Sequence, residues 1–164
     1  MFDVIYLKVM HKHRLRKKES KKIALEVKER AGVEVKGVMD KIEFNDLSVI
    51  LVDNEPIILE YDGKYYLTVY GVLKLKPEKY KVIVDQGALN PIMNGADVMK
   101  PGIVYADERI KEGDFVYVMV EGKQSPIAVG IALCNADEMK GKGKAVKNIH
   151  HLKDKIWNYF FKAQ

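Results

Sequence analysis

The chain has 164 residues, 48% of them hydrophobic and 31% charged, and its formal net charge is +5. A chain of this length and composition can bury one or two modest cores, which excludes a disordered or collagen-like protein. No run approaches the roughly 18 apolar residues that a membrane-spanning helix needs, and the N-terminus shows no signal-peptide cleavage site behind an apolar stretch, so we expect a cytoplasmic protein without membrane partners.

The first half of the chain predicts an α+β unit with an antiparallel sheet. Residues 2–9 are rich in strand-forming side chains, and apolar residues recur at helical spacing over residues 14–31, up to Gly32. Further strands are expected at residues 35–44, 48–52, 57–61 and 64–70. Asp62-Gly63 is typical of a two-residue type I′ turn and predicts a hairpin between the last two strands.

Positive charge is concentrated in two segments. Residues 8–30 contain ten Lys and Arg against three Glu, and residues 140–155 contain six Lys against one Asp. Many cations of the first segment lie near the start of the expected helix, where the helix dipole disfavours them by up to about 1 kcal/mol. Clustered cations suit a polyanion, because each neutralised phosphate releases counterions. A solvated helix face is the alternative that charge alone leaves open.

A polar break near Pro77 separates the two halves of the chain. Proline cannot donate to a sheet ladder, and residues 76–79 are polar between two apolar stretches. We therefore expect an N-terminal domain over residues 1–77 and a second domain over residues 78–164. Because the connector is short, the two domains are expected to pack together and present one composite surface.

Residues 82–104 carry the most informative pattern in the chain. A β-branched run ends at Asp85, which can cap a short helix over residues 86–93, and Gly95 is placed for a left-handed C-cap. Pro101-Gly102 then predicts a turn in which the glycine takes positive φ. Further short strands are expected at residues 103–106, 115–120 and 127–133, with a helical turn at 135–139. This spacing is typical of a small barrel or sandwich, with the doubly apolar strand 115–120 in the centre.

The order of these motifs resembles the PUA domain, an RNA-binding pseudo-barrel. The matching motifs are Asp85-x-Gly87-Ala88, Ile92-x-x-Gly95-Ala96-x-Val98-Met99-x-Pro101-Gly102-Ile103, Glu121-Gly122-Lys123-Gln124, Val129-Gly130 and the segment from Asn148 to Trp157. The chain is most similar to a two-domain family that includes the malignant T-cell amplified sequence proteins, which are partners of density-regulated protein, and the first half of ligatin. The resemblance implies fold class α+β, with an N-terminal α+β domain before a PUA pseudo-β-barrel and a C-terminal extension. Richness in Lys and Glu with a single Cys suits an archaeal, thermophilic member.

The resemblance implies a protein that docks on structured RNA, either tRNA or rRNA of the small ribosomal subunit, as an accessory factor in translation initiation, reinitiation or recycling. It implies a density-regulated-protein-like partner, and it leaves open a stand-alone PUA subunit of a tRNA- or rRNA-modifying enzyme. By resemblance the RNA surface comprises Gly87, Ala88, Asn90, Pro91, Asn94, Gly95, Ala96, Met99, Lys100, Pro101 and Gly102. We add five cations to this RNA surface because their positive charge suits phosphate: Lys123 in the second domain, and Arg14, Arg16, Lys17 and Lys18 on the first helix.

Catalytic and metal-binding patterns are hard to find in the sequence. The histidine pairs that begin at His11 and His150 lack the other ligands of a zinc signature, and no hydrolase, dinucleotide or P-loop motif occurs. We interpret Asn148 and His150 as structural residues that satisfy backbone groups, and Cys134, in an apolar setting, as a core thiol. We therefore expect a binding protein with no catalytic residues, cofactor or metal.

Overall fold

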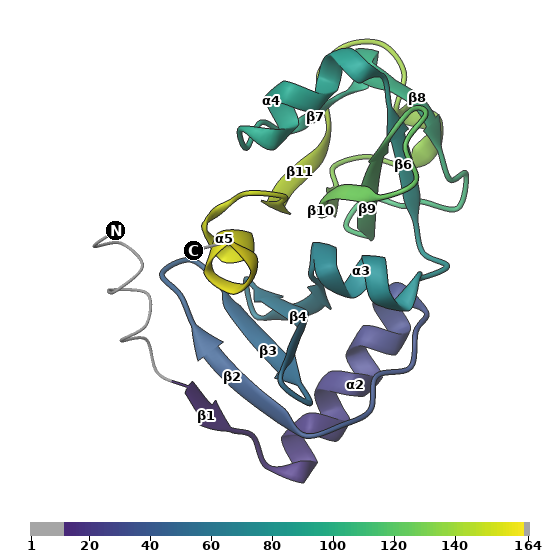
Figure 1. Ribbon diagram of the computed structural model, residues 1–164. Helices are drawn as coiled ribbons and strands as arrows, with labels where there is room; N and C mark the ends of the chain where they lie inside the picture. Colours follow the sequence, from purple (N-terminus) through teal and green to yellow (C-terminus); the bar gives the residue numbers. More distant parts are fainter. Residues whose placement is uncertain (1–11, 163–164) are drawn as a thin grey trace.

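The computed structural model describes residues 12–162 and contains two sheets, one above the other in Figure 1. The strand expected over residues 2–9 lies outside the described residues. Within the described part of the chain, no helix is long and apolar enough to cross a membrane.

The first sheet is antiparallel, with the strand order β1-β2-β3-β4-β5. Its strands are β1 (Lys12–Arg14), β2 (Met39–Glu43), β3 (Ser48–Val52), β4 (Glu55–Tyr61) and β5 (Lys64–Leu67). The long helix α2 (Lys17–Ala31) packs beside β5. It ends as expected at Gly32, which has φ 72°. The predicted hairpin is also confirmed, because Asp62 and Gly63 have φ of 51° and 75°.

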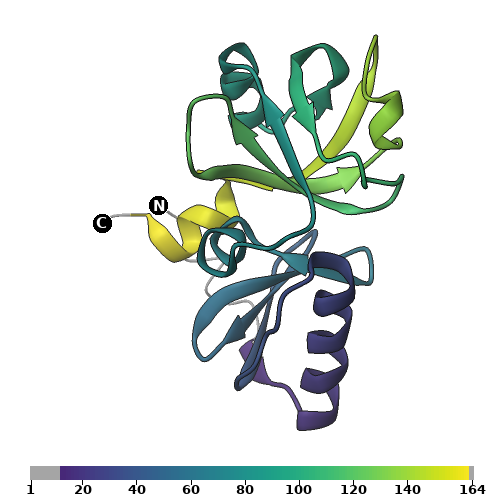
Figure 2. The same ribbon diagram turned by 90° about the vertical axis from the view of Figure 1, so that its right-hand side faces the viewer.

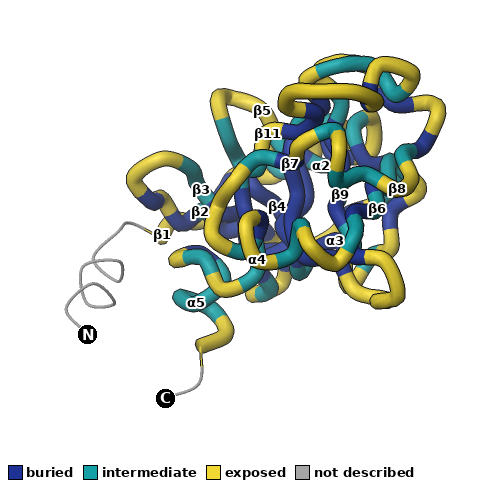
Figure 3. Tube along the Cα trace, turned by 90° about the horizontal axis from the view of Figure 1, so that it is seen from above, coloured by how far each residue is buried: buried dark blue, intermediate teal, exposed yellow. Residues whose placement is uncertain are grey.

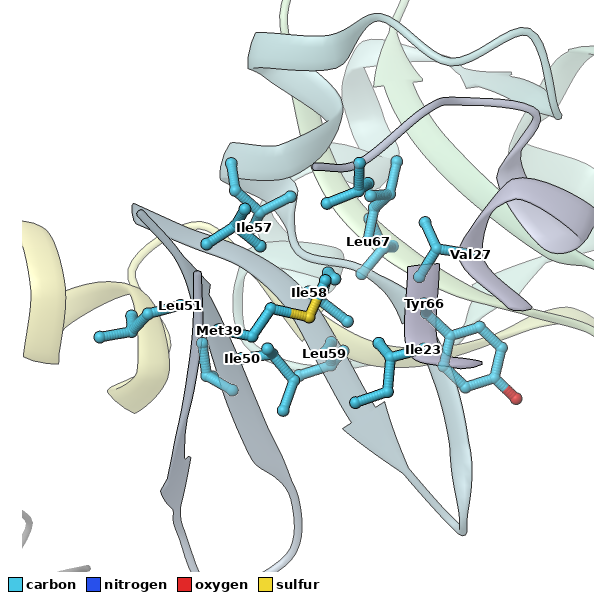
Figure 4. Packing of buried hydrophobic residues seen from close by; sticks show 14 of the residues in the cluster. Ile23, Val27, Met39, Ile50, Leu51, Ile57, Ile58, Leu59, Tyr66 and Leu67 are labelled. Carbon is cyan, nitrogen blue, oxygen red and sulfur yellow. The ribbon is translucent and has the colours of Figure 1, made fainter. Parts of the chain in front are cut away.

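One face of α2 builds the core of this sheet, as the helical spacing of its apolar residues predicts. Ile23 and Val27 are buried against strand residues that include Met39, Ile58 and Leu67 (Figure 4). Each large aliphatic side chain that is fully buried stabilises the fold by about 1.5–3 kcal/mol. The exposed face of the same helix carries five lysines together with Glu19, Leu25 and Glu29.

Two strand predictions in this half need correction. The strand expected over residues 35–44 begins only at Met39, and the strand expected over residues 64–70 ends at Leu67, where the helix α3 (Val69–Leu75) follows. The Thr68 hydroxyl oxygen accepts a 2.9 Å hydrogen bond from the Gly71 amide and caps α3. A Cβ on Gly71 would lie 2.3 Å from the Ile57 carbonyl oxygen, so the helix packs directly on β4. This tertiary contact overrides the strand propensity of the residues after Thr68.

The second sheet curls into a nearly closed pseudo-barrel. It has the order β7-β11-β10-β9-β6-β8, antiparallel except for the parallel pair β6 and β9. Its strands are β6 (Lys81–Val84), β7 (Val98–Met99), β8 (Ile103–Ala106), β9 (Phe115–Val120), β10 (Pro126–Ala132) and β11 (Lys144–His151). Strand β9 lies between two neighbours, which confirms it as a central strand. The expected helical turn is the 3-10 helix η3 (Ala136–Glu138).

The last helix, α5 (Lys155–Phe161), returns from the second sheet to the first, as the views in Figures 1 and 2 agree. Ile156 is buried in the core of the first sheet, and the rings of Phe44 and Tyr159 meet edge to face at 5.2 Å. Phe115 and Val129 of the second sheet belong to the same core. The buried chain in Figure 3 therefore runs through both sheets, which pack together as the short connector predicts.

Candidate nucleic-acid interface

The α4 surface is built by the segment between β6 and β8. It consists of the 3-10 turn η1 (Gln86–Ala88), the helix α4 (Leu89–Met93), the following loop, and the 3-10 turn η2 (Lys100–Gly102), with the adjacent 121–124 turn. Asp85 caps its start as predicted, because its carboxylate accepts a 3.1 Å hydrogen bond from the Ala88 amide. The Asp85 amide donates to the Gly102 carbonyl oxygen at 2.8 Å. The two ends of the segment are thereby held together.

A hollow of about 280 Å³ opens between these two ends. Its lining residues are Asp85, Gly87, Ala88, Pro91, Ile92, Asp97, Met99, Pro101 and Gly102. Most of them belong to the surface that the motif resemblance implies. Gly102 lacks the positive φ that the turn pattern predicts, since η2 is a 3-10 turn. A Cβ there would lie 3.4 Å from the Ala88 Cβ, so small residues at both positions let the two turns approach closely.

Four exposed residues of α4 and of the loop after it, which we call the rim, lie beside this hollow, and the loop leads to Asp97 in its lining. Asn90, Asn94, Gly95 and Ala96 are all exposed, and Gly95 has φ 96°, as its place after the helix predicts. The side-chain amide of Asn148 donates to the carbonyl oxygens of Ile92 at 3.1 Å and Ala96 at 2.9 Å. Strand β11 therefore fixes the rim.

Asn148 and His150, which are interpreted from the sequence as structural residues, have different hydrogen-bond partners. Asn148 satisfies backbone groups, as expected. The buried ring of His150 does not, because its Nδ1 lies 2.7 Å from the Asp154 carboxylate. Asp154 also accepts from the Trp157 amide at 2.8 Å and so caps α5.

Lysines of the α4 surface and of β11 lie on two sides of the hollow. Gly122, next to Lys123, lies close to Gln86, which places the 121–124 turn beside η1. On the other side the Lys100 amide donates to Gly143 at 2.8 Å, and Lys144 forms an ion pair with Asp97 at 3.1 Å. This ion pair is absent from the sequence prediction, because its partners are far apart in the chain.

Asp97 places an acidic group inside the hollow. Partial burial raises its pKa, but the Asn148 amide and the Lys144 ammonium outweigh this effect and hold the pKa below its ordinary value. The carboxylate is thus ionised at neutral pH, and Lys144 compensates its charge.

The helix expected over residues 14–31 begins only at Lys17, because Arg14 ends β1 and Arg16 is the N-cap. The basic residues around this helix start lie far from the α4 surface. Arg14, Arg16, Lys17 and Lys18 are exposed, and Figures 1 and 2 show the start of α2 and the helix α4 at opposite ends of the molecule. Arg14 forms a 2.8 Å ion pair with Asp40. The structure therefore does not bring the two basic regions into one continuous patch.

The described residues form neither a metal site nor the surroundings of a reactive thiol. Over residues 12–162, no three side chains of His, Cys, Asp or Glu are grouped to hold a metal ion, and His11 lies outside this range. Cys134 is partly buried, and burial raises the pKa of its thiol. A raised pKa disfavours the reactive thiolate.

Comparisons with known proteins cover both halves of the chain. A family model described as "PUA domain" matches residues 80–152, and one described as "Domain of unknown function (DUF1947)" matches residues 11–75. An uncharacterized protein of Methanocaldococcus jannaschii is 46% identical, over 93% of this chain and 99% of its own length. The crystal structure of a hypothetical protein from Pyrococcus horikoshii has a TM-score of 0.80 and 40% identity, covering 90% of this chain and 98% of that one.

Two eukaryotic relatives carry names that refer to function. Translation machinery-associated protein 20 of Schizosaccharomyces pombe is 32% identical over 74% of this chain and 72% of its own length. Malignant T-cell-amplified sequence 1-B of Xenopus laevis is 30% identical over 68% of this chain and 65% of its own length.

The fold and the matched motifs define a PUA-domain protein with an α+β unit in front of the pseudo-barrel. The relatives narrow this class further. The chain belongs to the family of translation machinery-associated protein 20 and the malignant T-cell-amplified sequence proteins, as its motifs predict, and its role is RNA-binding and related to translation.

Proposed function

We propose that this protein docks through its α4 surface on structured RNA, either a tRNA or a helix of the small ribosomal subunit. It acts there as an accessory factor in translation initiation, reinitiation or recycling, in the cytoplasm and without a catalytic step of its own. The observation that carries the proposal is the hollow in which Gly87, Ala88 and Gly102 meet between two flanking sets of lysines.

The shape of the hollow suits a sugar-phosphate backbone. Glycine and alanine leave the main chain of the two turns accessible, so a backbone with its 2′-hydroxyls can approach closely. No aromatic side chain is among the residues that line the hollow. Recognition of unpaired bases relies on aromatic stacking, whereas double-stranded RNA is read mainly by shape, phosphates and 2′-hydroxyls. The lining therefore favours structured RNA.

The flanking lysines supply the charge for phosphate contacts. Lys123 lies beside η1, and Lys100, Lys144 and Lys147 lie on the other side, near Asp97 and the 141–143 loop. Lysine binds phosphate as a point charge on a flexible stem, so these contacts supply affinity rather than sequence preference.

The two-domain relatives support a role in translation over that of a stand-alone subunit of an RNA-modifying enzyme. Both named eukaryotic relatives align with more than the PUA region of this chain. The density-regulated-protein-like partner stays part of the proposal and would be a separate chain. We also keep the proposed domain boundary at residues 77 and 78, which lies between the two family matches.

Co-sedimentation with ribosomal subunits from the source organism, alongside binding of its bulk tRNA, tests this proposal. We expect association with the small subunit, with tRNA, or with both, and a marked loss for Lys123→Glu. Lys64→Glu is the matched control, because Lys64 is exposed on β5 of the first sheet. Failure of the wild-type chain to bind either RNA would contradict the proposal, and equal losses for the two variants would remove Lys123 from the site.

A further inference from the structure

A second groove, of about 560 Å³, lies at the far end of the molecule from the α4 surface. It opens between the N-terminal half of α2 and the segment 35–39 that leads into β2. Its apolar lining consists of Leu15, Ala24, Val35, Val38 and Met39. Leu15, Val35 and Met39 are buried and close the first core, but Val38 is 49% exposed. The groove therefore presents aliphatic surface to solvent.

One wall of this groove is held by hydrogen bonds rather than by apolar packing. The Asp53 carboxylate accepts a 2.9 Å hydrogen bond from the Val38 amide, and the Asp53 amide donates to the Val38 carbonyl oxygen at 2.8 Å. These two hydrogen bonds hold Val38 at the edge of this second groove although its side chain is apolar. Because this wall is already ordered, the protein loses little conformational entropy there when a ligand binds.

The rest of the lining is strongly basic. Its cations are Arg14, Arg16, Lys17, Lys21 and Lys36, and no acidic residue is among the lining residues. Arg14 is paired with Asp40. In the part of the chain that the structure describes, the other four cations form no ion pair. Like charges around an apolar floor repel one another and favour an acidic occupant.

The floor distinguishes between two classes of acidic occupant. Double-stranded RNA would bring phosphates and sugars to the cations but no apolar group to the aliphatic floor, and unpaired bases stack on aromatic side chains, of which the lining has none. An acidic peptide can bring carboxylates to the cations and aliphatic side chains to the floor at the same time. The apolar floor therefore favours a peptide.

We propose that this α2 groove binds a short acidic segment of a partner protein, with one or two aliphatic side chains in the floor and carboxylates against Lys17, Lys21 and Lys36. This site is separate from the α4 surface and does not rest on the RNA-docking proposal. The protein would then join an RNA at one end to a protein at the other.

Panning a phage-displayed library of short random peptides against the full chain tests this inference. We expect the selected peptides to combine Asp or Glu with Leu, Ile, Val or Met. Their binding should weaken about tenfold or more for Lys17→Glu/Lys21→Glu, which turns two attractions into repulsions. Val38→Ser should also weaken binding without lowering the thermal midpoint, because Val38 is half-exposed.

The same helix provides a matched control. Lys18→Glu/Lys22→Glu changes the net charge equally, also at i and i+4, but neither residue lines the groove. We expect this variant to keep most of the affinity for the selected peptides. Equal weakening by both double variants, selection without an acidic consensus, or displacement of the peptides by an RNA hairpin would each overturn the inference.

Discussion

The side-chain amide of Asn148 donates a 2.9 Å hydrogen bond to the carbonyl oxygen of Ala96 and so ties β11 to the rim of the α4 surface. The same amide also satisfies the Ile92 carbonyl oxygen. The shape of the candidate RNA site thus depends on a residue that does not line its hollow.

Asn148→Ala is expected to lower both stability and RNA affinity. The change removes two hydrogen bonds, each worth about 0.5–1.5 kcal/mol. The Ile92 carbonyl oxygen keeps its 3.0 Å hydrogen bond from the Gly95 amide, and the bond to Ala96 is exposed to water, so neither oxygen is left buried without a partner. Thermal unfolding and tRNA affinity should be measured on the same preparation. If affinity persists at full strength while the melting temperature falls, the rim does not need this hydrogen bond to bind RNA.

Ala96→Tyr is expected to block RNA binding and leave stability unchanged. Ala96 is exposed, so a larger side chain projects into solvent and obstructs an approaching RNA backbone. Ala96→Ser is the small control and should bind as the wild type does. A lowered thermal midpoint would point instead to overpacking, which costs about 1–3 kcal/mol. Unchanged binding together with unchanged melting would remove Ala96 from the site.

The two sheets are expected to unfold in one transition. Ile156 of α5 is 3% exposed in the core of the first sheet, where Phe115 and Val129 of the second sheet also pack. Ile156→Ala should therefore lower the stability of the whole chain by about 2–5 kcal/mol. Calorimetry is the check. Two separate transitions in the wild type would show that the halves are independent.

Acid is expected to destabilise the junction between β11 and α5. Burial raises the pKa of Asp154, but hydrogen bonds from His150 and from two backbone amides outweigh it and lower the pKa. A depressed carboxyl pKa stabilises the fold above its unfolded value of about 3.9. This contribution is lost as the pH falls through the lower folded value.

The comparison that isolates this effect is Asp154→Asn, which retains an oxygen to cap α5. We expect the variant to be less stable near neutral pH and to lose less stability than the wild type on acidification. Parallel losses in the two proteins below about pH 4 would mean that other carboxylates govern the acid transition.

Local signals predicted much of the fold. The cap at Asp85, the left-handed glycines Gly32 and Gly95, and the hairpin turn at Asp62 all follow from the conformational preferences of single residues. The helix α3 could not be predicted in this way, because its position depends on the contact between Gly71 and the β4 backbone.

The positions of the charged residues relative to one another in space could not be predicted from the sequence. The pair of Lys144 with Asp97 and the wide separation of α2 from α4 both depend on how distant segments pack. Nothing local to Arg16 or Lys17 indicates that α5 docks on the first sheet and fixes the orientation of the two halves. A sequence pattern can therefore assign two basic clusters without showing that they face different directions.

The central claim is that RNA binds the α4 surface, and a map of perturbed backbone amides tests it most directly. In ¹H–¹⁵N spectra of the full chain titrated with tRNA or a ribosomal RNA hairpin, we predict perturbations over residues 86–102 and around Lys123, with the start of α2 unaffected. Perturbations confined to α2, or none on the α4 surface at saturating RNA, would contradict the account.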